Sequence, residues 1–209
     1  RDRLRSRGLG DVYKRQTYLM AAAAMGVNIK IHECNPMHIT PIIKTLRSMG
    51  CEIKEHFYNT EGAAKSTIEL KKGAAYGRLE SPGFIIAETY PAYPTDAQPI
   101  ILPLLATVKG STLIADRIFP ERFGAAEELL KMGADIKTKE YGQIIKGKRR
   151  LKGADVYSRD LRAGAAMIIA GLMSSGRTTI YDNGYIQRGY DGITEKLRRL
   201  GAEIWETQY

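Results

Sequence analysis

The chain has 209 residues, of which 44% are hydrophobic, 26% charged and 8% aromatic, as in an ordinary globular protein. This length suits one or two domains with a sufficient core, and two cysteines are too few for a disulfide scaffold. No run of about 18 apolar residues is present, so no transmembrane helix is predicted. The unusual feature is a net charge of +9, which by itself suggests nucleic-acid binding.

The first sixteen residues hold a large share of this charge. They contain six basic and two acidic residues, a net charge of +4, and show no helical or strand period. One interpretation is a basic arm that binds phosphate backbones. We instead predict that residues 1–16 are a non-native or disordered leader, because they lack an initiator methionine and resemble a translated adaptor sequence. The folded domain is then residues 17–209.

The rest of the chain repeats one pattern three times, in the order buried helix, strand, amphipathic helix, strand. The first helix of each unit is Ala-rich and apolar on nearly all sides, which is typical of a buried helix. These helices are predicted at 19–25, 101–108 and 165–173, and the last strands at 51–57, 134–140 and 202–208. Three units around one centre place the buried helices inside, in one α/β domain.

A glycine follows each predicted helix of the repeat. Those after the first helices are Gly26, Gly110 and Gly176, and those after the second helices are Gly50, Gly133 and Gly201. The two glycines of a unit are 24, 23 and 25 residues apart. Glycine at this place relieves the left-handed conformation that ends many helices.

Carboxylates precede the second and third buried helices, in the segments YPTD and SRDLR. Asp, Ser and Thr are preferred N-cap residues, so helix capping is the ordinary interpretation. The alternative is that Asp96 and Asp160 lie at one rim of the domain as acid/base or substrate-orienting groups. The spacing alone leaves both open.

Cationic side chains stand near the starts of the second helices. His38, Arg122 and Arg188 lie 12, 11 and 13 residues before the glycine that ends each helix. Arginine suits bidentate recognition of carboxylate or phosphate, whereas isolated surface arginines are usually only solvated. The cysteines and histidines lack the spacing of metal ligands, so no metal site is predicted.

At these residues the sequence resembles the UDP-N-acetylglucosamine 1-carboxyvinyltransferase family of enolpyruvyl transferases. The similar segments are YPTDAQ, IFPERF, RDLRAGAAMIIAGL and IQRGYDGITEKLRRLGAEI. The resemblance extends over residues 17–209 and covers only the C-terminal of the family's two domains. It implies an inside-out α/β barrel of three repeated helix–strand–helix–strand units with buried central helices.

The resemblance also implies a reaction and a set of site residues. The reaction is transfer of the enolpyruvyl group of phosphoenolpyruvate to the 3-hydroxyl of UDP-N-acetylglucosamine, an addition–elimination of cytoplasmic peptidoglycan synthesis that needs no cofactor. The implied catalytic residues are Asp96, for the sugar hydroxyl proton, and Asp160, for the tetrahedral intermediate. The implied substrate-binding residues are Asp96, Ile118 through its main chain, and Arg122, Arg162 and Arg188 around phosphoenolpyruvate.

The sequence departs from the family pattern before Thr17, where VYKRQ replaces an acidic, Gly-containing stretch. The reactive cysteine of the family belongs to its other domain, and neither Cys34 nor Cys51 has a matching context. We therefore expect a truncated gene product with half an active site. Its partner is then the missing N-terminal domain of the same enzyme, and the isolated chain is inactive.

Two alternatives are kept. The related enolpyruvyl transferase of the shikimate pathway shares the fold and the phosphoenolpyruvate chemistry. A basic nucleic-acid-binding repeat module is supported by the net charge alone, and we disfavour nucleic acid as a partner. No membrane partner is expected.

Overall fold

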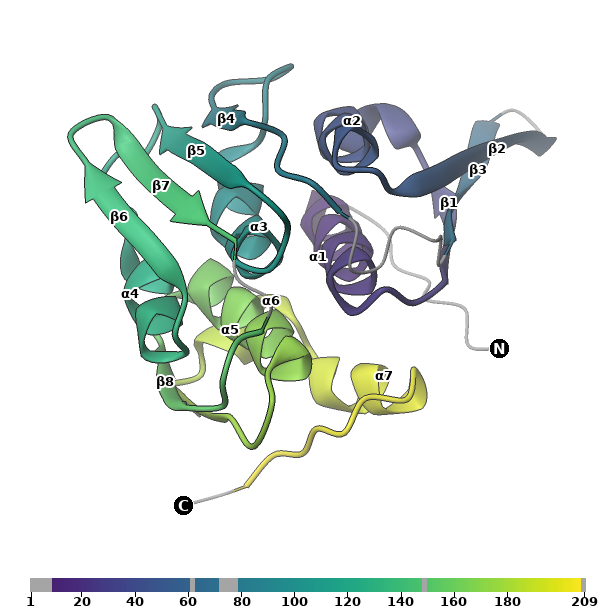
Figure 1. Ribbon diagram of the computed structural model, residues 1–209. Helices are drawn as coiled ribbons and strands as arrows, with labels where there is room; N and C mark the ends of the chain where they lie inside the picture. Colours follow the sequence, from purple (N-terminus) through teal and green to yellow (C-terminus); the bar gives the residue numbers. More distant parts are fainter. Residues whose placement is uncertain (1–8, 61–62, 72–78, 148–149, 208–209) are drawn as a thin grey trace.

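Three helices lie at the centre of the fold, and each belongs to one unit of the repeat (Figure 1). The computed structural model describes residues 9–60, 63–71, 79–147 and 150–207. The central helices are α1 (Leu9–Met25), α3 (Gln98–Leu105) and α5 (Leu161–Met173). All three pack against one another, and every residue of α3 is buried. This confirms the predicted buried helices.

The first unit continues from α1 into a three-stranded antiparallel sheet. Its elements are β1 (Ile29–Cys34), the 3-10 helix η1 (Pro36–Ile39), α2 (Thr40–Ser48), β2 (Glu52–Thr60) and β3 (Ala63–Lys71). The strand order is β1-β3-β2. Helix α2 buries the apolar stripe Ile42, Ile43 and Leu46, as its amphipathic pattern predicts.

The second unit surrounds α3. Its other elements are β4 (Phe84–Ala87), the 3-10 helix η2 (Thr95–Ala97), β5 (Ser111–Asp116), α4 (Gly124–Lys131), β6 (Asp135–Lys139) and β7 (Gly142–Lys146). The strand order is β4-β5-β7-β6. β4 and β5 are parallel because α3 connects them as a crossover, so Ala87 lies opposite Asp116 where both strands end.

The third unit repeats this crossover around α5. Its other elements are β8 (Asp155–Ser158), β9 (Thr179–Asp182), α6 (Tyr185–Gly189) and α7 (Ile193–Arg199). β8 and β9 form a parallel pair, with Ser158 opposite Asp182. The predicted last strand at 202–208 is wrong for 202–207, which pair with no strand among the described residues; Gln208 lies outside them. A strand needs a hydrogen-bonded neighbour, and Trp205 there is 67% exposed.

The glycines that end the helices of the repeat have the left-handed backbone conformation predicted from the sequence. All six predicted helix-ending glycines have positive φ, between 62° and 103°. At Gly133 a side chain would meet nothing within 4 Å, so the backbone conformation alone requires glycine there.

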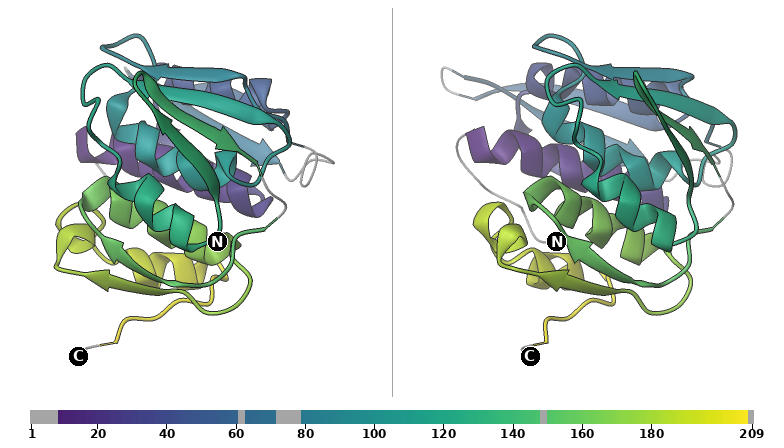
Figure 2. Two further views of the ribbon diagram at one scale, coloured as in Figure 1. Left: turned by 60° about the vertical axis from the view of Figure 1, so that its left-hand side comes forward. Right: turned by 90° about the vertical axis from the view of Figure 1, so that its left-hand side faces the viewer.

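The sheets form an outer layer but do not close. Figure 2 shows the four-stranded sheet lying over α3 and α4. The described strands form three separate sheets. The α/β class, the three units and the central helices are therefore observed, whereas the closed inside-out barrel is not, because no hydrogen-bonded ladder among the described strands joins one sheet to the next.

Helix α1 starts well before the predicted domain boundary at Thr17. Residues 9–16 form its first turns, where the sequence shows no helical period. The Tyr13 hydroxyl donates to the Gly189 carbonyl at 3.0 Å, and Gln16 is buried. Residues 1–8 lie outside the described residues. The division into a leader and a domain remains a prediction, but position 17 is not the end of an element.

Candidate active site

An ion pair joins the second and third units at the starts of their central helices. Asp96 lies in η2, directly before α3, and Arg162 lies in the first turn of α5. Arg162 Nη2 donates to Asp96 Oδ2 at 2.6 Å, and these side chains are 20% and 41% exposed. Burial acts to lower the pKa of Arg162, but the hydrogen bond and charge of Asp96 outweigh it and raise the pKa above its ordinary value. Arg162 is thus a fixed cation.

Arg122 approaches the same carboxylate from the segment after β5. Its Nη1 lies 3.7 Å from Asp96 Oδ1. The same nitrogen donates to the Thr95 carbonyl at 3.3 Å and to Thr95 Oγ1 at 3.2 Å. Its guanidinium lies 4.2 Å from the centroid of the Phe119 ring. Two arginines from different units therefore meet at Asp96, whose side chain is still partly open to solvent.

The two carboxylates that looked equivalent in the sequence have different roles in the fold. Asp160 is the N-cap of α5, and its Oδ1 accepts from the main-chain N–H groups of Arg162 at 2.7 Å and Ala163 at 2.9 Å. Asp96 makes no capping hydrogen bond. Asp160 is therefore a capping residue, and its hydrogen bonds fix the backbone of the helical turn that carries Arg162.

This cluster does not include three further candidates, namely Ile118, Arg188 and His38. The N–H of Ile118 donates to Asp116 Oδ1 at 2.9 Å, so this main-chain donor is already used within a turn. Arg188 is exposed in α6, where its guanidinium lies 5.4 Å from the centroid of the Tyr185 ring. Arg188 makes no ion pair within the described part of the chain. His38 is also exposed, beside Asn35.

Two site residues were missed by the sequence reasoning, namely Thr95 and Asp116. Thr95 Oγ1 donates to Asp116 Oδ2 at 2.5 Å. Asp116 is the last residue of β5, and Asp182 is the last residue of β9 in the next unit. That repeated position is a signal in the sequence, but the helices and glycines that define the repeat do not mark the ends of these strands.

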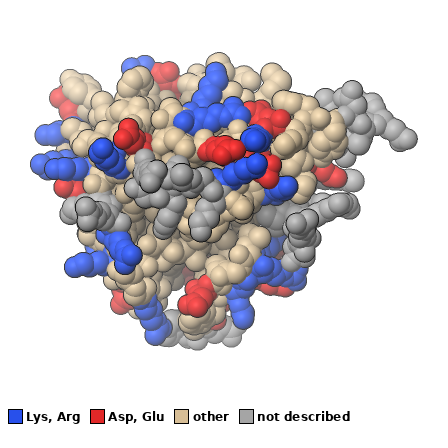
Figure 3. Space-filling model, turned by 45° about the vertical axis from the view of Figure 1, so that its right-hand side comes forward, with Lys and Arg blue, Asp and Glu red and all other residues tan. Residues whose placement is uncertain are grey.

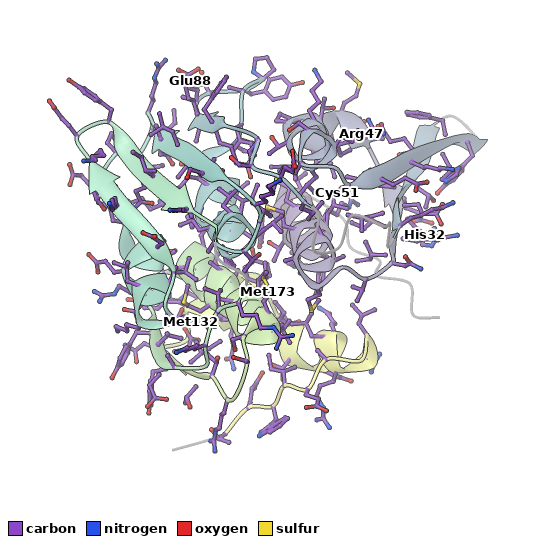
Figure 4. All side chains as sticks on the ribbon, in the orientation of Figure 1. His32, Arg47, Cys51, Glu88, Met132 and Met173 are labelled. Atoms are coloured by element: carbon purple, nitrogen blue, oxygen red, sulfur yellow. The ribbon has the colours of Figure 1, made fainter. Side chains whose placement is uncertain are left out.

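The cysteines and histidines form no second site. Burial raises the pKa of the Cys51 thiol to about 11, so it is protonated at neutral pH. Figure 4 labels Cys51 and His32, which belong to different segments of the first unit. Within the described ranges, no three His, Cys, Asp or Glu side chains are placed to hold a metal ion.

The charge of the molecule is not gathered into one basic face in the view that Figure 3 gives. Lys and Arg side chains there are interspersed with Asp and Glu. Of the described helices, none is long and apolar enough to cross a lipid bilayer. The ion pairs of Arg122 and Arg162 with Asp96 bring two guanidinium groups to one carboxylate.

Comparison with known sequences finds similar proteins over most of the chain. The profile of the EPSP synthase (3-phosphoshikimate 1-carboxyvinyltransferase) family matches residues 4–197. The UDP-N-acetylglucosamine 1-carboxyvinyltransferase of Desulfofundulus thermocisternus is 40% identical over 92% of this chain and 74% of its own length. UDP-N-acetylglucosamine 1-carboxyvinyltransferase 2 of Shouchella clausii is 37% identical over 92% of this chain but only 42% of its own. The chain thus spans less than half of this second relative.

Solved structures share the fold. The EPSP synthase from Acinetobacter baumannii superposes with a TM-score of 0.74 and 22% identity, over 95% of this chain and 47% of that one. The enolpyruvyl transferase NikO from Streptomyces tendae gives a TM-score of 0.70 and 24% identity, over 90% of this chain and 43% of that one. At these identities the likeness concerns the fold alone.

Proposed function

This chain belongs to the EPSP synthase (3-phosphoshikimate 1-carboxyvinyltransferase) family, and we propose that it supplies one half of an enolpyruvyl transferase active site. The acceptor is UDP-N-acetylglucosamine, as the names of relatives at 40% and 37% identity suggest. The observation that carries the proposal is Asp96, a partly open carboxylate placed between Arg122 and Arg162.

The arginines suit the donor substrate. Phosphoenolpyruvate carries a carboxylate and a phosphate, and both are recognised best by fixed guanidinium groups. Arg162 is fixed by Asp96, and Arg122 by Thr95. Arg188 is exposed and free of ion pairs in the part of the chain described, so we assign it a direct contact with the incoming anion.

Asp96 suits the acceptor. The sugar 3-hydroxyl passes its proton to the Asp96 carboxylate as its oxygen bonds to C2 of phosphoenolpyruvate, whose C3 gains a proton. Loss of that C3 proton and of phosphate from the tetrahedral intermediate then restores the double bond in the product. We assign Asp160 a role in this elimination step through its Oδ2 atom, because its Oδ1 atom accepts the N–H groups at the start of α5. Ile118 contacts the sugar nucleotide through its main-chain carbonyl, because its N–H already donates to Asp116.

The acid that protonates C3 and the remaining anion contacts belong, in this proposal, to a partner domain that precedes this one. The reaction is a step of peptidoglycan synthesis in the cytoplasm. It therefore serves cell wall biogenesis and, through it, cell shape and division.

Ligand protection of the 209-residue chain tests the proposal. UDP-N-acetylglucosamine should raise the melting temperature saturably. Asp96→Asn should weaken this binding roughly tenfold, because one strong acceptor for the sugar hydroxyl is lost. Arg199→Gln is the matched control, since Arg199 is exposed on α7 and, among the described residues, pairs with Glu195 of the same helix. Absence of saturable protection, or equal loss in the control, would contradict the proposal.

The shikimate-pathway transferase is the second candidate, because the matching family profile carries that name. It predicts saturable protection by shikimate 3-phosphate and none by UDP-N-acetylglucosamine. The same melting experiment with both ligands separates the two functions.

A further inference from the structure

Asp116 ties together the two segments that carry the candidate ligand groups. Its Oδ1 accepts from the N–H groups of Ile118 and Phe119, both at 2.9 Å, which fixes the turn after β5. Its Oδ2 accepts from Thr95 Oγ1 at 2.5 Å, across 21 residues of sequence. One carboxylate therefore holds both the Ile118 main chain and the residue directly before Asp96.

The equivalent aspartate of the third unit, Asp182, provides a comparison, because its hydrogen bonds stabilise its own turn. Asp182 also ends the second strand of a parallel pair. Both of its oxygens accept main-chain N–H groups of its own turn, from Gly184, Tyr185 and Ile186. Only one oxygen of Asp116 is used in this way, and the other reaches a different segment.

The Asp116 carboxylate also sets the direction of the Thr95 hydroxyl. An ionised carboxylate can only accept, so the hydroxyl hydrogen must point to Asp116 and its lone pairs are left for another donor. Arg122 Nη1 is that donor, at 3.2 Å. Since guanidinium has no acceptor, a reversed hydroxyl would present its hydrogen to a group that can only donate.

Resting on the proposed function, we propose that Asp116 is the positioning residue of this site. Through Thr95 it holds the Arg122 guanidinium beside Asp96, and through its turn it holds the Ile118 main chain. It touches no substrate itself. Its role is to keep the acceptor-binding and anion-binding groups in one geometry.

Asp116→Asn is the selective test. The amide oxygen can still accept the two turn N–H groups, but the amide nitrogen replaces the acceptor of Thr95 with a donor. Thr95→Val removes the hydroxyl at nearly constant shape, and Thr95→Ser keeps it. Asp182→Asn is the matched control, because Asp182 ends an equivalent strand and its hydrogen bonds, among the described residues, stay within its own turn.

The first readout needs no ligand. NMR measures how fast the Arg122 guanidinium rotates about its Cζ–Nε bond. Rotation should be roughly tenfold faster in Asp116→Asn and Thr95→Val, because a charge-assisted tie is lost. It should be unchanged in Thr95→Ser and Asp182→Asn. Unchanged rotation in Asp116→Asn overturns the proposal, whether or not any ligand binds.

The second readout is affinity for UDP-N-acetylglucosamine. We expect roughly tenfold weaker binding in each of Asp116→Asn and Thr95→Val, and no further loss in the double variant, because both break the same tie. Fully additive losses, or an equal loss in Asp182→Asn, overturn the positioning role. If the unsubstituted chain does not bind this ligand, the proposed function fails, and the rotation measurement still decides the role of Asp116.

Discussion

At the scale of single residues, Glu128 shows how a buried charge can be held. Its side chain is fully buried in α4. It accepts from Lys131 at 2.6 Å, from Arg159 at 3.0 Å and from the Tyr157 N–H at 3.0 Å. Burial acts to raise the pKa of Glu128, but these donors outweigh it and the pKa lies below its ordinary value. The carboxylate thus ties α4 of the second unit to β8 of the third.

Glu128→Gln should lower the free energy of unfolding by about 1–3 kcal/mol at neutral pH, because two cations lose their buried partner. Because the folded pKa is lowered, this contribution is complete above the ordinary value of 4.5 and is lost as the pH falls through the folded value. Urea denaturation followed by far-UV circular dichroism measures both effects. Glu127→Gln is the control, since Glu127 is exposed and pairs at 3.4 Å with the same Arg159. A difference between wild type and Glu128→Gln that grows in acid would contradict this account.

At the scale of elements, sequence periodicity predicted the long buried helices and missed the shortest strands. α3 and α5 are apolar on nearly every side, so their burial could be predicted. β4 and β8 have four residues each, too few for a period, and were not identified as strands. Those two strands bring the chain to the starts of α3 and α5. The meeting of Asp96 with Arg162, 66 residues apart, depends on that tertiary packing, which no local pattern contains.

Gly133 provides a test of the helix-ending glycines. Gly133→Ala should lower the free energy of unfolding by about 1–2 kcal/mol, because the φ of Gly133 is +84°. An added side chain would meet nothing within 4 Å, so a steric clash does not contribute. Gly124→Ala should be neutral or stabilising, since Gly124 begins α4 without a positive φ and an added side chain makes only ordinary contacts, at 3.4 Å, with Arg159. Thermal melting of the two variants compares them directly. Equal effects would show that the conformation of Gly133 is not what requires glycine.

The first turns of α1 provide a second test at this scale. Tyr13→Phe should lower the free energy of unfolding by about 1 kcal/mol, because it removes the hydroxyl that donates to Gly189 and keeps the ring. Tyr13→Ala should cost more, since its ring also packs edge-on against Tyr190 at 5.5 Å. Urea denaturation measures both. If neither variant changes stability, the Tyr13 side chain contributes nothing to the stability of the fold.

At the scale of the whole molecule, the net charge has two parts. Of the total of +9, residues 1–16 contribute +4. In the described remainder, arginines such as Arg122, Arg159 and Arg162 are engaged by carboxylates. A basic protein of this kind can meet an anionic substrate with a few fixed cations without presenting a continuous basic surface.

Any binding of this chain to nucleic acid should be weak, and replacing Arg1, Arg3, Arg5 and Arg7 with serine should abolish it at about 0.15 M salt, since such binding would rest on phosphate contacts alone. Fluorescence anisotropy with a labelled DNA duplex at several salt concentrations measures this. The affinity for UDP-N-acetylglucosamine should not change. Salt-dependent DNA binding that persists in the variant would favour the nucleic-acid module instead.

The strand that is not formed after α7 has a practical consequence. Trp205, the chain's one tryptophan, lies in this segment and is 67% exposed. Its indole is therefore already in contact with water in the folded protein and can be quenched by iodide. Its fluorescence emission should change little when the three central helices melt. A shift of that emission to shorter wavelength on mixing with another polypeptide would instead report that the segment had been covered.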